Sequence, residues 1–384
     1  MQGSTDRILT THVGSLPRPR PLADLLIRHE RGDAIDEAER DRLITEAVEM
    51  VVHQQAEAGI DVGNDGEQPR VGFQTYVAQR MQGFGGESSR PPSRDQVEFP
   101  DFSALLQERR KNTAKITNAP QAIAEVRYTD LRPAEQECEV FLRCATAATF
   151  TERFMTAASP GIIATTLLNA YYDSYERYVF ALAQQIQREY ELIHARGLLL
   201  QIDAPDLAME RTRFFQHESL TRFQEIVEMH IAAINLAIEH IPAERIRLHV
   251  CWGNYDGPHI HDVPLEAILP LLYQARVGAL SIELANPRHQ HEYRVFQTLP
   301  LPDTMLLIPG VIDSTVHYVE HPEVVANRIL QAVEVVGDRS RVIASTDCGF
   351  STFVGAETIA PSVVWAKLRT LREGADLAST RLWG

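Results

Sequence analysis

The chain has 384 residues, of which 44% are hydrophobic and 23% charged, a composition typical of a globular protein with a large buried core. Its formal net charge of −15 argues against a nucleic-acid partner or a basic membrane-binding surface. No apolar run approaches the roughly 18 residues of a membrane span, and the polar N-terminus lacks the pattern of a secretion signal. We therefore expect a cytoplasmic protein that acts on small molecules and forms one domain over residues 1–384.

Short apolar or β-branched runs alternate with longer amphipathic stretches, which is the pattern of repeated βα units. The expected strands are, in chain order, 7–12, 59–65, 161–168, 198–203, 245–251, 279–285, 304–312 and 342–348. The clearest expected helices are 173–195, 220–240, 264–276 and 322–336. Eight such strands predict an α/β fold, a single (β/α)8 TIM-type barrel. Residues 83–118 break the rhythm with a segment rich in Gly, Ser and Pro, and we interpret them as an inserted loop region.

Metal-ligating side chains stand at the ends of several expected strands, where the active sites of parallel barrels form. The strand 245–251 ends in His249-Val250-Cys251, and the period of two in a strand puts both potential ligands on one face. Glu283 lies on the next expected strand and Cys348 ends the last one. Two thiolates, an imidazole and a carboxylate suit Zn²⁺ better than Mg²⁺ or Ca²⁺. The sequence therefore predicts a zinc site at these four residues.

The remaining cysteines and a histidine pair offer weaker alternatives. The chain has only four cysteines, too few for a disulfide framework. Cys138 and Cys144 lie in a segment with helical spacing and no nearby histidine, which indicates packed thiols. His259 and His261 form a rival metal pair, but Gly257-Pro258 before them favours a loop that lines the pocket.

Three polar clusters follow other expected strands, at 11–15, 64–70 and 201–205. Each alone is explained equally well by turn formation, because Gly, Asp and Pro are common in turns. A hydroxyl and two carboxylates brought together at one mouth of the barrel would suit a substrate with an ammonium group.

Taken together, these residues resemble the catalytic C-terminal barrel of cobalamin-independent methionine synthase. The likeness extends over residues 12–348 and includes the family's His-x-Cys, a Glu on the next strand and a late Cys. It implies that Ser15, Glu67 and Asp203 bind an amino-acid substrate, the two acids through its amino group. Because the chain has one barrel, it is similar to the stand-alone branch, which includes methyltransferases and epoxyalkane:coenzyme M transferases.

The sequence departs from the synthase at the positions expected to contact the alkyl donor and the amino acid. Where the synthase has an aromatic residue for stacking on folate, this chain has Ala170, so that Asn169 and either Tyr171 or Tyr172 are the candidate donor contacts. Met209 stands where the synthase has a second acid near its amino-acid substrate.

A further departure concerns the proton donor. Ser314-Thr315 stands where the synthase places a proton-donating histidine. The resemblance therefore leaves three candidate acids in catalysis, which are Asp313, His317 and His12.

The resemblance implies a zinc-dependent S-alkyltransferase, with methyl transfer to a homocysteine-like thiol as the first candidate reaction and Glu283 as the most displaceable ligand. The alternative is addition of a coenzyme M-like thiol to an epoxide, with Arg18 or Arg70 binding the sulfonate. A metal-free decarboxylase-like barrel and a zinc-stabilised binding protein also stay open. The expected partners are a small thiol and an alkyl donor, without nucleic acid or membrane, and a homo-oligomer is compatible with the sequence.

Overall fold

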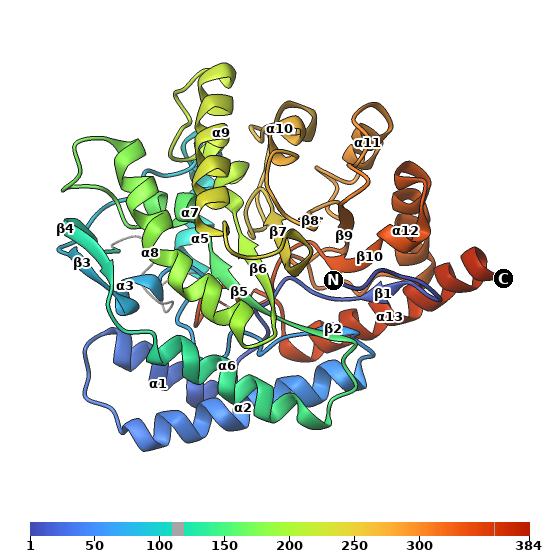
Figure 1. The fold of residues 1–384 in the computed structure, drawn as a ribbon, viewed down its shortest axis with the longest axis horizontal. Coiled ribbons are helices and arrows are strands. Elements are labelled where there is room, and N and C mark those ends of the chain that lie inside the picture. Colours follow the sequence, from blue (N-terminus) through green and yellow to red (C-terminus); the bar gives the residue numbers. More distant parts are fainter. Residues whose placement is uncertain (110–118, 357) are drawn as a thin grey trace.

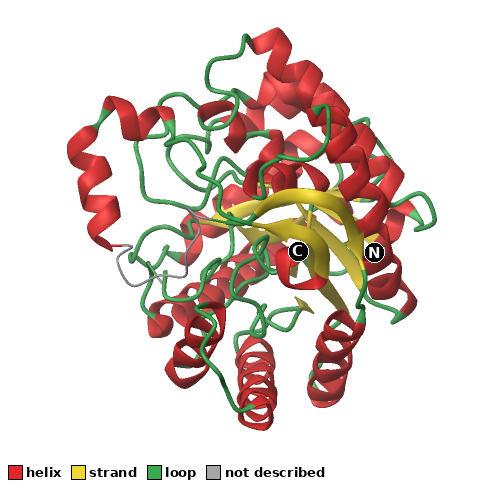
Figure 2. Ribbon diagram, turned by 90° about the vertical axis from the view of Figure 1, so that its left-hand side faces the viewer, coloured by secondary structure: helices red, strands yellow, loops and turns green. Residues whose placement is uncertain are grey.

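A closed barrel of parallel strands forms the centre of the computed structural model, which describes residues 1–109, 119–356 and 358–384. The strands lie in the order β1-β10-β9-β8-β7-β6-β5-β2, and a parallel bridge between Thr11 and Val62 joins the two ends of this sheet. The helices surround the strands (Figures 1 and 2). The barrel strands are β1 (Leu9–Thr10), β2 (Val62–Gly63), β5 (Glu152–Ala158), β6 (Leu199–Asp203), β7 (Ile246–Val250), β8 (Ala279–Ile282), β9 (Leu306–Ile312) and β10 (Ile343–Thr346). The predicted (β/α)8 fold is confirmed.

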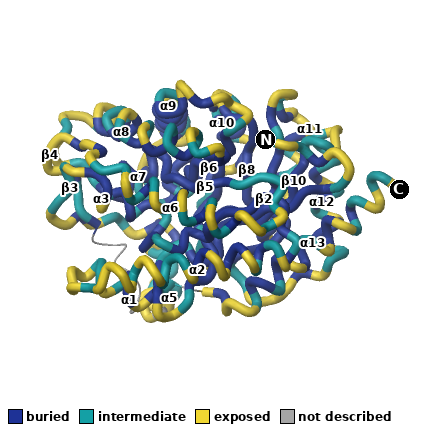
Figure 3. Tube along the Cα trace, turned by 60° about the horizontal axis from the view of Figure 1, so that its bottom comes forward, coloured by how far each residue is buried: buried dark blue, intermediate teal, exposed yellow. Residues whose placement is uncertain are grey.

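The helices that cover the barrel alternate with its strands along the chain. Apart from α7, the longer ones have a buried inner face and an exposed outer face (Figure 3), as the amphipathic spacing predicts. The helices outside the insertion are α1 (Arg20–Glu30), α2 (Glu37–Glu57), α3 (Val77–Arg80), α6 (Arg132–Cys144), α7 (Pro160–Thr166), α8 (Tyr175–Ala195), α9 (Leu220–Ala237), α10 (Leu265–Leu272), α11 (Val295–Thr298), α12 (Pro322–Val336) and α13 (Pro361–Trp383). In the described ranges, no helix is long and apolar enough to cross a membrane.

The prediction of a strand at 161–168 is wrong, because this segment forms the short helix α7. Ser159 caps the helix by accepting a hydrogen bond from the Ile162 N–H, and Pro160 occupies the first turn, where its missing N–H costs nothing. Every residue of α7 is buried, so its apolar run has no amphipathic period that would distinguish it from a buried strand. The barrel strand is β5, one segment earlier.

The region 83–118 contains regular structure as well as loop. Its first residues belong to β3 (Met81–Gly85), which pairs in antiparallel fashion with β4 (Gln121–Tyr128), and two helices follow, α4 (Arg94–Glu98) and α5 (Pro100–Arg109). This two-stranded sheet of β3 and β4 lies beside the barrel rather than in its sheet (Figure 1). Residues 110–118 lie outside the described residues.

Candidate functional site

Three of the four proposed metal ligands meet at the carboxyl ends of β7 and β10. His249 lies within β7, Cys251 follows this strand directly, and Cys348 lies two residues beyond β10. One ligand atom from each residue lies within 4.8 Å of the others, and all three side chains are buried. Two sulfur atoms and an imidazole nitrogen at this spacing fit the tetrahedral coordination of zinc.

The electrostatics of this group favour a thiolate. Hydrogen bonding from Cys348 and the neighbouring His249 ring lower the pKa of Cys251 well below its ordinary value, in spite of burial. Cys348 donates that hydrogen bond, and its own pKa is raised well above the ordinary value, so Cys251 holds the negative charge of the pair. A buried thiolate needs a cationic partner. A divalent cation would balance that charge, so the donor set fits a metal ion.

Glu283, the fourth proposed ligand, lies next to this group but its carboxylate is held by other residues. The Trp252 backbone N–H donates to Glu283 Oε2 at 3.0 Å, and the Asn286 side chain donates to Oε1. Burial raises the pKa of Glu283 to about 7, and the negative charge of Cys251 contributes to this rise. The structure therefore shows this carboxylate beside the two cysteines, with both of its oxygens accepting hydrogen bonds.

Asp347 ties the two strand ends that carry Glu283 and Cys348. Its carboxylate accepts hydrogen bonds at 2.8–2.9 Å from three successive backbone N–H groups, those of Leu284, Ala285 and Asn286. Three donors of this kind hold a buried carboxylate firmly in one position. The spacing between the two loops that carry Glu283 and Cys348 is thus fixed by the residue next to Cys348.

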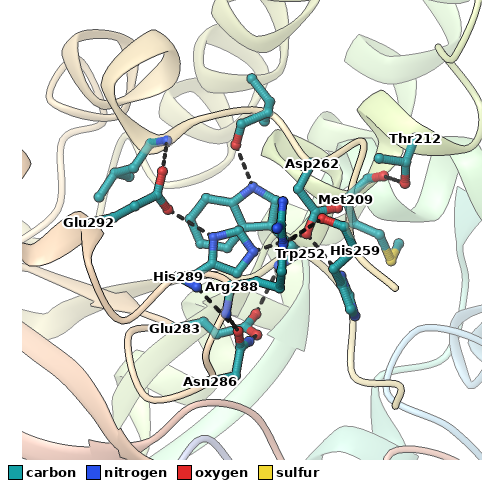
Figure 4. A network of polar contacts seen from close by, with 12 residues as sticks. Met209, Thr212, Trp252, His259, Asp262, Glu283, Asn286, Arg288, His289 and Glu292 are labelled. Atoms are coloured by element: carbon teal, nitrogen blue, oxygen red, sulfur yellow. Dashed lines mark hydrogen bonds and ion pairs between the residues drawn. The ribbon is translucent and has the colours of Figure 1, made fainter. Parts of the chain in front are cut away.

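A buried His–Asp–His network lies behind Glu283 (Figure 4). Asp262 Oδ2 lies 2.8 Å from His259 Nδ1 and 2.9 Å from His289 Nε2. The other ring nitrogen of each histidine also faces an acceptor, the Tyr255 carbonyl at 3.0 Å and the Glu292 carboxylate at 2.8 Å.

Rings with an acceptor at both nitrogens are held as imidazolium ions, because a carboxylate or carbonyl cannot donate. Burial lowers the pKa of both rings, but the hydrogen bonds to these acceptors and the surrounding negative charges together outweigh it, raising the pKa of His259 to about 9 and that of His289 to about 10. A metal ion requires a free lone pair on neutral imidazole, so this cluster functions as an ion-pair network. The His289 ring stacks on Trp252, with 3.9 Å between centroids, and so joins the loops that follow β7 and β8. His261 instead lies near the Glu98 carboxylate at 2.5 Å.

A cavity opens beside the thiolates, and the three predicted amino-acid contacts line it. Ser15, Glu67 and Asp203 lie in its wall together with the three ligand residues. Glu67 Oε1 accepts from Thr156 at 2.9 Å, whereas Glu67 Oε2 is buried without a hydrogen-bond partner among the described residues. Burial raises the pKa of Asp203 to about 7. Buried carboxylates with spare acceptor capacity suit an ammonium group.

The loops after β1 and β10 approach one another closely at this cavity. A Cβ placed on Gly349 would collide with the Ser15 hydroxyl, which lies against this glycine. The Phe350 N–H donates to the Ser15 carbonyl at 2.8 Å. Glycine is therefore required next to Cys348 so that the turn with Ser15 and the proposed metal ligand can share one wall.

Comparison with known proteins finds relatives that match along most of this chain. A methionine synthase from Sulfurisphaera tokodaii is 24% identical over 375 residues, covering 97% of this chain and 93% of the relative. A 2-hydroxypropyl-CoM lyase from Xanthobacter autotrophicus is 24% identical, with 100% and 98% covered. A B12-independent methionine synthase from Shewanella shares the fold with a TM-score of 0.73 at 20% identity, covering 98% of this chain and 99% of that one. The resemblance to the cobalamin-independent methionine synthases is thereby confirmed. No family model matches the sequence.

The residues expected to replace the synthase's folate-stacking aromatic lie away from the cavity. Asn169 Oδ1 accepts from the backbone N–H groups of Tyr171 and Tyr172, and its amide donates to the Tyr172 carbonyl at 2.8 Å. Asn169 therefore forms a local turn, a role that Asn commonly has. Tyr171 is 54% exposed and does not belong to the described cavity wall.

The three candidate proton donors also lie outside the described cavity wall. His12 is buried against Gln55, and burial lowers its pKa to about 4. Asp313 accepts from the N–H and hydroxyl of Thr315 at 2.8 and 2.7 Å. His317 is exposed, and its ring accepts from the Ala360 N–H. The structure does not bring these side chains to the thiolates.

Two arginines that the sequence pattern does not predict as site residues line the cavity. Arg90 comes from the insertion and Arg213 from the loop after β6. The proposed sulfonate ligands, Arg18 and Arg70, are instead buried in bonds to the Glu67 carbonyl and to Glu137 respectively, and neither lines the cavity. Neither arginine stands at the end of a predicted strand, which is where the sequence pattern points to site residues.

Proposed function

We propose that this protein transfers an alkyl group to the sulfur of a small thiol, with zinc held by His249, Cys251 and Cys348 and with Glu283 as a fourth, displaceable ligand. The observation that carries the proposal is the cluster of two cysteines and a histidine in the wall of the same cavity as Glu67 and Asp203. Zinc bound there would lower the pKa of an incoming thiol, so that the thiolate nucleophile forms at neutral pH. An acid site next to a thiol-activating site suits an amino acid with a thiol side chain.

The chain's own residues would divide the work between binding and charge balance. Glu67 and Asp203 would accept hydrogen bonds from the substrate's ammonium group, and Ser15 would add a hydroxyl. The Trp252 N–H and the Asn286 amide are positioned to hold Glu283 when its carboxylate is not a ligand. The substrate sulfur would then lie beside Cys251 and Cys348, oriented for attack on the alkyl carbon.

A coenzyme M-like thiol is the second candidate substrate. It is supported by the relative named 2-hydroxypropyl-CoM lyase, which aligns over 100% of this chain, and by the arginines in the cavity wall. Addition of a thiolate to an epoxide also forms a carbon–sulfur bond, breaks one carbon–oxygen bond of the ring, and needs a proton for the alkoxide that stays on the product.

The ligand cluster also weighs against the two remaining alternatives. A metal-free decarboxylase-like barrel would have no need for two buried cysteines beside a histidine. A purely structural zinc site would be closed by four permanent ligands, whereas here the fourth candidate is held by other donors and the group faces a cavity.

The test is product formation by zinc-loaded protein given homocysteine with methyl donors, or coenzyme M with epoxypropane. We expect mass spectrometry to detect either methionine or the 2-hydroxypropyl thioether, and Cys251→Ser to lower the rate by about 100-fold or more. Cys144→Ser, which alters a half-buried cysteine far along the chain in α6, should retain the wild-type rate. Equal rates for Cys251→Ser and wild type would contradict the proposal.

We further propose that residues 1–384 act as one domain, because β1 near the N-terminus pairs with β10 and α13 packs against α12. Reduced thiols at the metal site are consistent with activity in the cytoplasm.

A further inference from the structure

The cavity wall carries positive as well as negative side chains. Arg90 and Arg213 line it together with the acids Glu67 and Asp203. Arg90 is nine-tenths buried, with 6% of its side chain exposed, and it forms an ion pair with Glu210, which is fully buried. Glu210 also accepts from the Phe214 N–H at 3.2 Å, so its carboxylate is shared between two donors.

Arg90 has hydrogen-bonding capacity that the protein does not use. Its Nε–H is buried and has no hydrogen-bond partner among the residues the structure describes. Leaving a buried guanidinium donor without an acceptor is costly, because the charged group has lost its water. An acceptor on a molecule in the cavity would satisfy it.

Arg213 extends this positive character along the same wall. It lies close enough to Tyr255, another wall residue, that its charge counteracts the rise that burial causes in the pKa of that phenol. Tyr255 in turn hydrogen-bonds to Asp95 of α4, and Arg90 precedes the same helix. The insertion and the loop after β6 therefore supply one cationic side of the cavity.

We infer that Arg90 and Arg213 form a subsite for an anionic group, a carboxylate or sulfonate, on one of the two substrates. This inference rests on the proposed function, since it names the chemistry of the substrate that enters the same cavity. The planar guanidinium presents N–H donors in a fork that matches the oxygens of such anions. The acids near the metal ligands would attract an ammonium group, and the arginines would orient the anion away from those acids.

Two sources of the anion can be separated by binding measurements on the zinc-loaded protein. Calorimetry would compare coenzyme M with 2-mercaptoethanol, which has a thiol but no sulfonate, and would separately titrate p-aminobenzoylglutamate, a dicarboxylate without a thiol. We expect one of the two anions to bind wild type and to lose affinity by about 10-fold or more in Arg213→Gln. If the variant loses affinity for coenzyme M, the anionic group belongs to the thiol substrate. If it loses affinity for the dicarboxylate, the anionic group belongs to the alkyl donor.

Arg90 needs a conservative variant, because removing its charge would leave Glu210 buried and unpaired. Arg90→Lys keeps the ion pair but lacks the Nε–H and the forked guanidinium group. It should therefore weaken the binding of the same anion that Arg213→Gln weakens. Arg211→Gln is the matched control, since Arg211 donates to the carbonyls of Phe215 and Gln216 and does not line the described cavity wall.

The inference is overturned if wild type binds neither anion, or if Arg213→Gln and Arg90→Lys bind both as wild type does. Failure of the proposed function has a different signature. In that case 2-mercaptoethanol would show no zinc-dependent binding, whereas binding of the thiol-free dicarboxylate would still show whether the arginines hold an anion.

Discussion

Single side chains in this barrel are fixed mainly by the acceptors and donors around them. His259 and His289 each face acceptors at both ring nitrogens, and this arrangement determines that they are cations in spite of burial. Asp347 is fixed in position in a similar way, because its carboxyl group accepts from three backbone N–H groups and so joins two loops that carry proposed metal ligands. Charge states at this site therefore follow from hydrogen-bond geometry.

The charge of His259 should make the free energy of unfolding depend on pH. Its folded-state pKa of about 9 lies above the ordinary 6.5, so the charged ring stabilises the fold fully below about pH 6.5 and loses this effect as pH rises through about 9. His259 has a φ of 53°, a region that Asn tolerates well, so His259→Asn removes the ring with little backbone strain.

We expect His259→Asn to lower the free energy of unfolding by about 1–3 kcal/mol at pH 6, and by less at pH 10. Urea denaturation at both pH values measures this. His317→Asn, which changes an exposed histidine, should have little effect at either pH. A loss for His259→Asn that is as large at pH 10 as at pH 6 would show that the ring's charge is not the stabilising feature.

The contact between Gly349 and Ser15 gives a second prediction for individual residues. Gly349→Ala should destabilise the protein by about 1–3 kcal/mol, because its methyl group collides with the Ser15 hydroxyl. In a Ser15→Ala background the collision is reduced, so the same substitution should cost less. Thermal denaturation of the four proteins of this double-mutant cycle tests it, and additive effects would contradict the described contact.

The elements show where sequence reasoning succeeds and where it does not. Strands such as β6 and β9 are apolar runs between turn residues and were predicted within a few residues. α7 was predicted as a strand because a fully buried helix of seven residues has no polar face to reveal its period. The proposed metal ligands stand at or near the ends of predicted strands, whereas Arg90 lies in an insertion without such a reference point.

The insertion contributes to the site through Asp95 of α4. This buried carboxylate accepts from the His259 N–H at 2.9 Å and from the Tyr255 hydroxyl at 3.3 Å. Asp95→Asn should weaken this attachment and increase hydrogen exchange in residues 253–259 and in α4. Asp101→Asn, at the exposed start of α5, should leave that exchange unchanged. Unaltered exchange in Asp95→Asn would mean that the insertion is held by other contacts.

At the scale of the whole molecule, the barrel brings residues far apart in the sequence to one mouth. Ser15 and Cys348 are separated by most of the chain, yet the pairing of β1 with β10 puts them in one cavity wall. This convergence follows from the closed parallel sheet, so a sequence that predicts the barrel also predicts which strand ends meet. It does not predict side-chain direction, which is why His12, Asp313 and His317 proved to lie outside the cavity wall.

The central claim, a catalytic metal at His249, Cys251 and Cys348, is tested most directly by elemental analysis of reduced, purified protein and of Cys348→Ser, with circular dichroism on both. The account predicts about one zinc per wild-type chain, and loss of that zinc in the variant with the barrel intact. Wild-type protein that binds no zinc even after zinc is added back, or a Cys348→Ser variant that retains it in full, would contradict the account.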